Sequence, residues 1–212
     1  MRKLVMSDIH GCFNEMIALL EAADYKPADD FIVICGDLID RGPDSAKVVK
    51  YWYEIQNSHP HRCIVLRGNH EQMMHWCLSG ITTMWLQYGG AEAVVSFRQE
   101  FSQETDLRTH LDWLLSQPLM HVDEEYVYVH AGIHPKWAYH CQTSDDVLWM
   151  PAKDFYQYSV EAILQSTEGR KVVHGHTPYW CVQDDGARIR CDLGAAVAER
   201  PKLALVDLTM VS

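Results

Sequence analysis

The chain has 212 residues, a formal net charge of −11 and a hydrophobic fraction of 48%. This length and composition are typical of a globular protein, and we expect a single domain over residues 1–212. The acidic balance argues against a binder of nucleic acid or anionic membranes, because such proteins carry a basic surface. No apolar run approaches the ~20 residues that cross a bilayer, so we expect no membrane contact.

The first predicted strand begins at about Lys3, which leaves no room for a signal peptide. The seven cysteines form no Cys-x-x-Cys pair, and several lie in apolar runs, as reduced thiols do. We therefore expect a cytoplasmic protein without a disulfide framework.

The first third of the chain alternates short apolar runs with helical patterns, as βαβ units do. Apolar runs predict strands at 4–6, 31–35 and 63–66. Residues with helical spacing predict helices between them, one over about 13–20 and one from Pro43 to the His59-Pro60 break.

A third helix is expected from residue 70 or 71 to about residue 80. Residues 81 to about 118 then look mostly helical, with a break at Gly89-Gly90 that can seat a turn against the rest of the fold. Aromatic residues of this region are expected to pack the helices, with stacking on a nucleobase left open. They are Trp76, Trp85 and Tyr88.

From Tyr126 onward we expect strands to dominate. The predicted strands are 126–129, 172–173, 180–182, 189–191 and 203–206. Asp185-Gly186 predicts a hairpin turn between the third and fourth of these. The pattern predicts an α/β fold in which a mixed first half packs on a second, more antiparallel sheet, with helices outside.

Five predicted strands end directly in residues that can bind metal ions. The five loops are 7–11, 36–42, 67–71, 130–132 and 174–177. Ligands of α/β sheets sit beyond the carboxyl ends of the strands, so these loops can converge on one site. That convergence predicts an enzyme with a metal centre.

The residue types predict a dinuclear site with oxygen and nitrogen ligands. Asp8 and His10 are two residues apart, so in an extended segment they point the same way toward one divalent ion. The Asp37 carboxylate can bridge to a second ion. The other ligands of the second ion follow later strands, as Asn69, His130 and His176. Mn²⁺ is the expected metal, and Fe²⁺ and Zn²⁺ fit the same ligands.

Four further side chains have chemistry that suits phosphate transfer. His70, one residue past a ligand, can protonate a leaving alkoxide, and Asp40 can hold its other ring nitrogen. Arg41 and Arg67 can bind phosphate oxygens, with Asn69 as a third contact.

Two neighbouring residues are expected to have structural roles instead. Glu71 suits a negative charge at a helix N-terminus, and His174 suits a supporting role beside the ligand His176.

These loops resemble those of the metallo-dependent phosphoprotein phosphatases of the calcineurin-like phosphoesterase superfamily, especially small bacterial and phage-type members. The matching motifs are Asp-x-His-Gly at 8–11, Gly-Asp-x-x-Asp-Arg-Gly at 36–42, Gly-Asn-His-Glu at 68–71, His-Ala-Gly at 130–132 and His-Gly-His-Thr at 174–177. The resemblance implies two β-sheets in a sandwich between helices, with the site at one sandwich edge. It implies the same ligand set, the acid pair Asp40 and His70, and the phosphate-binding arginines Arg41 and Arg67.

The expected function is hydrolysis of phosphate monoesters by attack of metal-bound hydroxide, with a serine/threonine phosphoprotein as the favoured substrate. One departure bears on the substrate: bacterial members usually carry a phosphate-binding arginine after Leu-Trp-x, and here Leu148-Trp149-Met150 precedes Pro151. A dinucleoside tetraphosphate hydrolase is the first alternative, although that branch tends to have Asp where this chain has Glu71. A catalytically silent module that binds phosphorylated partners is the second, and the oligomeric state is left open.

Overall fold

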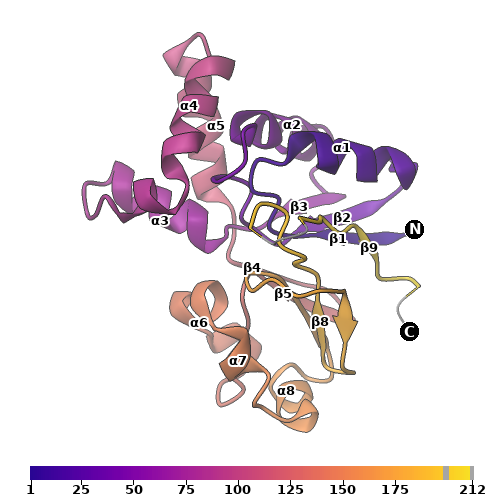
Figure 1. Ribbon diagram of the computed structural model, residues 1–212. Helices are drawn as coiled ribbons and strands as arrows, with labels where there is room; N and C mark the ends of the chain where they lie inside the picture. Colours follow the sequence, from indigo (N-terminus) through magenta and orange to yellow (C-terminus); the bar gives the residue numbers. More distant parts are fainter. Residues whose placement is uncertain (198–200, 211–212) are drawn as a thin grey trace.

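Two β-sheets form the centre of the computed structural model, which describes residues 1–197 and 201–210 (Figure 1). The first sheet has the strand order β3-β2-β1-β9, with β1 (Lys3–Met6), β2 (Phe31–Ile34), β3 (Cys63–Val65) and β9 (Val206–Asp207). The second has the order β4-β5-β6-β8-β7, with β4 (Met120–Val122), β5 (Tyr126–Val129), β6 (Lys171–His174), β7 (Gln183–Asp184) and β8 (Arg188–Arg190).

In the described part of the chain, each sheet contains three parallel strands. In the first sheet β1, β2 and β3 run the same way, and Met6 pairs with Ile34 and Ile34 with Val65. In the second sheet β5, β6 and β8 are parallel, and β4 and β7 are antiparallel edge strands. The carboxyl ends of the parallel strands of each sheet therefore end at a common edge.

Alternation of side chains explains why these strands are continuous apolar runs. Successive residues of a strand point to opposite faces, so a strand buried on both faces has no polar position. Val5 of β1 and Val173 of β6 share the core between the two sheets. Met6 instead packs under the helices of the first sheet, and Val172 packs under those of the second.

Helices cover the outer face of each sheet (Figure 1). The first sheet is covered by α1 (Phe13–Ala22), α2 (Ser45–Ser58), α3 (Asn69–Leu78), η1 (Met84–Tyr88), α4 (Gly90–Glu100) and α5 (Glu104–Ser116). The second is covered by α6 (Ser144–Trp149), α7 (Ala152–Phe155) and α8 (Val160–Ser166), with η2 (Tyr139–Cys141) before them. The two-sheet sandwich flanked by helices confirms the predicted α/β fold class.

The prediction that strands dominate after Tyr126 was wrong, because three helices lie between β5 and β6. The outer face of the second sheet is apolar and needs cover, which Val147, Phe155 and Ile163 of these helices supply. The helices have only four to seven residues each, which is too short to show a clear helical period.

The predicted strand at 203–206 was also largely wrong, because β9 contains only Val206 and Asp207. Leu203 and Leu205 pack against the first core without joining the sheet. The hairpin at Asp185-Gly186 is confirmed, with its first strand at 183–184 rather than 180–182.

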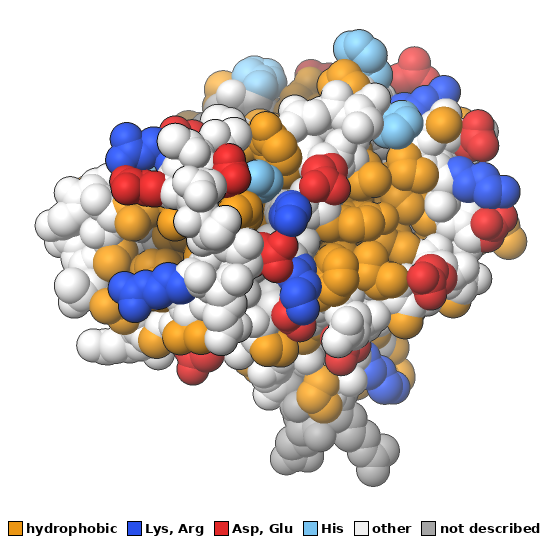
Figure 2. Space-filling view, turned by 90° about the horizontal axis from the view of Figure 1, so that it is seen from above, with side chains coloured by type: hydrophobic (Ala, Val, Ile, Leu, Met, Phe, Trp, Pro, Cys, Tyr) orange, Lys and Arg blue, Asp and Glu red, His pale blue; other side chains and the backbone are white. Residues whose placement is uncertain are grey.

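The surface shows mixed charges. On the described part of the face in Figure 2, hydrophobic side chains gather in one area, and Lys and Arg lie among Asp and Glu rather than in a basic patch. Among the described residues, no helix combines the length and apolarity that a membrane crossing requires.

Candidate metal centre

The five predicted loops meet at one edge of the sandwich. Backbone hydrogen bonds join the first loop to the second and the fourth to the fifth, while side-chain contacts tie the third loop to Asp37 and the fifth to Asp8. The Asp8 N–H donates to Gly36 O at 3.1 Å, and the His10 N–H donates to Asp37 O at 2.9 Å. On the second sheet the Gly175 N–H donates to His130 O at 2.8 Å. The convergence of the loops is therefore confirmed.

Two glycines allow the loops to approach so closely. A Cβ on Gly68 would lie 2.2 Å from Asp37 Oδ1, and a Cβ on Gly175 would lie 2.0 Å from Asp8 Oδ2. Any side chain at either position would push a carboxylate out of the site.

Several residues of the site other than glycine have a left-handed backbone conformation. The sequence pattern of a strand followed by a loop does not predict this conformation. Asp8 and His10 have φ of +53° and +47°, so the expected extended segment was wrong. Left-handed φ recurs at Asp37, Asp40, Arg41 and His176. Such conformations persist where surrounding contacts hold them, and they are concentrated at functional sites.

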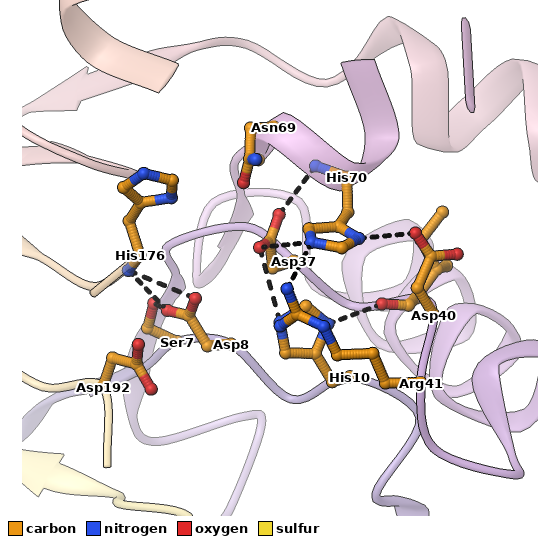
Figure 3. A network of polar contacts seen from close by, with 12 residues as sticks. Ser7, Asp8, His10, Asp37, Asp40, Arg41, Asn69, His70, His176 and Asp192 are labelled. Atoms are coloured by element: carbon orange, nitrogen blue, oxygen red, sulfur yellow. Dashed lines mark hydrogen bonds and ion pairs between the residues drawn. The ribbon is translucent and has the colours of Figure 1, made fainter. Parts of the chain in front are cut away.

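Asp37 lies at the centre of the site, between two groups of possible metal ligands (Figure 3). Its Oδ2 is 3.5 Å from His10 Nε2 and 3.5 Å from His130 Nε2. One buried trio contains His10, Asp37 and His70, and the other contains Asp8, Asp37 and His130. Within each trio the ligand atoms lie within 4.8 Å of one another, so a carboxylate shared by two ions fits this arrangement.

Asn69 and His176 complete the second group. Asn69 Oδ1 is 2.9 Å from His130 Nε2, and His176 Nδ1 is 3.2 Å from the same nitrogen. The structure thus brings together all six predicted ligands.

The imidazoles are held by their other ring nitrogens. His10 Nδ1 bonds Ile39 O at 2.8 Å, and His130 Nδ1 bonds Cys35 O at 2.9 Å. Each Nε2 therefore faces Asp37, and backbone carbonyls of this kind commonly orient metal-binding histidines.

The electrostatics of the site favour cations. Burial raises the pKa of the Asp8 and Asp37 carboxyl groups, because little water remains to solvate their charge. Burial also lowers the pKa of His10 to about 3 and that of His176 to about 4, so both are neutral, as metal ligands must be. Divalent ions would supply the positive charge that two buried carboxylates need, so the residues fit a dinuclear centre.

His70 and Asp40 form the predicted pair. His70 Nδ1 lies 2.6 Å from Asp40 Oδ2, and both side chains are buried. Burial raises the pKa of Asp40 to about 8 and lowers that of His70, since it disfavours charge on either residue alone. The Nδ1 bond leaves His70 Nε2 facing the site.

The two arginines differ in position. Arg41 reaches into the site, with Nη2 2.8 Å from His70 Nε2 and Nη1 against His10 Nε2. Arg67 is half-buried, and its Nε has no hydrogen-bond partner among the described residues. Phosphate binding by Arg67 stays a prediction.

Three contacts of the site were not predicted from the sequence. The Ser7 hydroxyl donates to Asp8 Oδ2, and Asp192 lies beside Asp8 with its pKa raised to about 6, mainly by burial (Figure 3). The Trp85 indole N–H donates to Asp40. Motif spacing alone does not predict them. Ser7 is next to Asp8, but nothing in the sequence shows where its hydroxyl points, and the other two contacts join residues that are far apart in the chain.

His174 has the expected supporting position. It is fully buried, and its Nε2 lies 3.1 Å from the Tyr156 hydroxyl rather than among the ligands.

Glu71 holds two of the loops together. As the first-turn acid of α3, it accepts the Gly68 N–H at 2.7 Å, which agrees with the expected role. It also accepts N–H groups of the neighbouring loop, from Asp37 at 3.0 Å, Leu38 at 2.8 Å and Ile39 at 3.4 Å.

Glu71→Gln is therefore expected to lower the free energy of unfolding by about 2–4 kcal/mol, because the amide group cannot accept all of these buried N–H donors. Urea denaturation measures the change. Glu104→Gln, at an exposed first-turn acid of α5, should stay within about 0.5 kcal/mol of the parent. Equal stability of the two variants would contradict the role of Glu71.

Fold and site together define a metal-dependent phosphoesterase: a two-sheet sandwich with a carboxylate shared between two groups of ligands at its edge. The sequence matches the calcineurin-like phosphoesterase family over residues 1–206, and the chain belongs to that family.

Comparison with individual proteins adds detail. The chain is 34% identical to the symmetrical bis(5'-nucleosyl)-tetraphosphatase of Buchnera aphidicola subsp. Schizaphis graminum over 134 residues, which are 62% of this chain and 45% of the relative. The chain spans about half the length of the curated relatives it matches.

Two solved structures share the fold. One is a putative diadenosine tetraphosphatase, with a TM-score of 0.66, 21% identity and coverage of 97% of this chain and 93% of that chain. The other is a serine/threonine phosphatase from Saccharomyces cerevisiae, with a TM-score of 0.66, 16% identity and coverage of 97% and 78%.

Proposed function

We propose that this chain hydrolyses a dinucleoside tetraphosphate with two divalent ions bound at the centre around Asp37. The observation that carries the substrate is the 34% identity to a symmetrical bis(5'-nucleosyl)-tetraphosphatase. It favours the first alternative from the sequence over a phosphoprotein, since protein phosphatases among the solved structures, at 16% to 20% identity, show the fold alone.

The proposed ligands divide into two sets that share Asp37. As the motif spacing predicts, Asp8 and His10 complete the first set, and Asn69, His130 and His176 complete the second. Asp8 also lies within reach of the second set, in the trio with Asp37 and His130. Mn²⁺ is the proposed metal, and Fe²⁺ or Zn²⁺ suits the same donors. When bound, two such ions lower the pKa of water and stabilise negative charge that builds up on the reacting phosphate.

The remaining side chains orient the substrate and move one proton. His70 Nε2 faces the site because Nδ1 is bonded to Asp40, and it accepts a hydrogen bond from Arg41 Nη2 at 2.8 Å. Once Arg41 has moved onto the substrate and Nε2 is protonated, His70 can donate that proton to the leaving oxygen. The Arg41 guanidinium and the Asn69 amide can bind phosphate oxygens as charge develops. An ion at His10 Nε2 requires the Arg41 Nη1 contact to open, which frees that arginine for the substrate.

The segment that follows His176 carries aromatic residues that suit a nucleotide. The Tyr179 N–H donates to Asp192 O at 3.0 Å, close to Asp8. Trp180, the next residue, is 77% exposed, four residues beyond the ligand His176. An exposed indole is a stacking platform for a nucleobase, which a phosphopeptide does not require.

The test is product analysis by metal-stripped protein with Mn²⁺ added back. Diadenosine tetraphosphate, a phosphoserine peptide and a phosphotyrosine peptide are compared side by side, with Asp37→Asn purified in parallel as the control for contaminating enzymes. We expect Mn²⁺-dependent cleavage of the dinucleotide, and cleavage at the middle of its phosphate chain gives two molecules of ADP.

The other outcomes overturn the proposal in distinct ways. Phosphate release from a peptide alone would restore the phosphoprotein phosphatase. No turnover of any substrate would favour the silent binding module, against which the complete ligand set and the His70–Asp40 pair argue.

A further inference from the structure

Trp85 connects the helical segment of residues 84–116 to Asp40 and His70, the proposed proton-donating pair. Its indole Nε1 lies 2.8 Å from Asp40 Oδ1 and 2.8 Å from Asp40 Oδ2, so one N–H is shared by both oxygens. Trp85 is 3% exposed and Asp40 is fully buried. Water therefore has little access to this hydrogen bond.

The contact holds the same Asp40 carboxylate that binds His70. Asp40 Oδ2 bonds His70 Nδ1 at 2.6 Å, and the Asp40 N–H donates to Ser45 Oγ at 3.0 Å. An indole N–H only donates, so it can hold the carboxylate but cannot take its proton. The arrangement is a chain from Trp85 through Asp40 to His70 (Figure 3 shows its last two members).

Two glycines allow η1 and the start of α4 to lie against this chain. Gly89 has φ of +104°, its carbonyl accepts the Arg41 N–H at 3.3 Å, and a Cβ there would lie 2.5 Å from Arg41 N. A Cβ on Gly90 would lie 2.5 Å from the Trp85 ring. The turn therefore packs directly on residues 40 and 41. The sequence predicted a turn at Gly89-Gly90 but not the part of the fold that it contacts.

We propose that Trp85 is a positioning residue for the Asp40–His70 pair and that the turn at residues 84–90 sets the direction in which His70 presents its proton. This inference rests on the proposed function of His70 as proton donor. It gives the helical segment a role in turnover although that segment supplies no proposed ligand.

Trp85→Phe removes the N–H and keeps a buried aromatic ring. Trp113→Phe is the matched control, because Trp113 also lies in the helical segment and donates its indole N–H to Gln56 Oε1 at 2.7 Å, away from Asp40. We expect Trp85→Phe to lower kcat about tenfold, with KM and metal content unchanged, because it weakens a step whose full worth is about 10²–10⁴-fold. Trp113→Phe should leave kcat within about twofold.

A double-mutant cycle separates positioning from a general structural effect. In the His70→Ala background, Trp85→Phe should change kcat less than about twofold, because the imidazole that Trp85 positions through Asp40 is absent. An equal fold loss in both backgrounds, or equal behaviour of the two tryptophan variants, would overturn the inference. Loss of the effect of His70→Ala itself would instead count against the proposed function.

A second measurement needs no turnover. In Zn²⁺-loaded protein, the proton resonance of the His70 Nδ1–H is assigned by its disappearance in His70→Ala. We expect this resonance to shift or exchange faster with water in Trp85→Phe and to stay unchanged in Trp113→Phe. An unchanged resonance in Trp85→Phe would overturn the inference even if the wild-type chain cleaved none of the tested substrates.

Discussion

His70→Ala is expected to lower kcat about 10²–10⁴-fold while both ions stay bound, because the variant removes the proposed proton donor and leaves the proposed ligands in place. The reason is the geometry of the pair: Nδ1 is held by Asp40 at 2.6 Å, and Nε2 faces the site. Steady-state kinetics on the substrate that the wild type cleaves, together with metal analysis of the same preparation, measure both quantities.

Metal content makes this test decisive for the role of His70. His70 Nε2 is 3.9 Å from Asp37 Oδ2, and with His10 these residues form one of the two candidate trios. Loss of an ion in His70→Ala would make His70 a ligand rather than an acid. His75→Ala, on the last turn of the same helix, should keep both activity and metal.

Asp37→Asn should lose at least one ion per chain and most of its turnover. Asp37 Oδ2 is the oxygen that stands 3.5 Å from an imidazole of each ligand group, and a neutral amide is a poor bridge between two cations. Metal analysis after dialysis against a trace of Mn²⁺ gives the occupancy.

Asp106→Asn removes one carboxylate from the exposed first turn of α5 and should leave the occupancy unchanged. Two ions in Asp37→Asn would exclude the bridging role, whatever happened to the rate. If one ion remains in Asp37→Asn, its affinity is compared with the affinities of the two ions in the wild type. The comparison shows which ligand set depends more on Asp37.

Much of the site could be predicted from the sequence because its ligands follow a local rule. Each ligand stands within a few residues of a strand end, and parallel strands place their carboxyl ends at one edge. Asp8, Asp37 and His130 were predicted on that basis and lie in one trio. The substrate could not be predicted in this way, because the same metal ligands suit the hydrolysis of both phosphate monoesters and dinucleotides.

Other contacts could not be predicted, because they join residues that are far apart in the chain or that carry no distinctive pattern. Trp85 lies 45 positions from Asp40 and Glu71 lies 33 from Leu38. Considered without its partners, Trp85 is predicted to pack between helices. Most of its ring does pack in the first core. Nothing in the sequence shows that its one N–H points at the Asp40 carboxylate.

The sequence by itself determined the candidate site residues and that the two-sheet α/β fold brings them to one edge, since strand periodicity and motif spacing are local properties of the chain. Only the tertiary structure decided how those residues are held. The left-handed backbone at Asp8 and His10, the helices between β5 and β6, and the hydrogen bond from Trp85 to Asp40 all follow from packing between distant segments. Packing depends on the shape of both partners at once, and no window of sequence contains both.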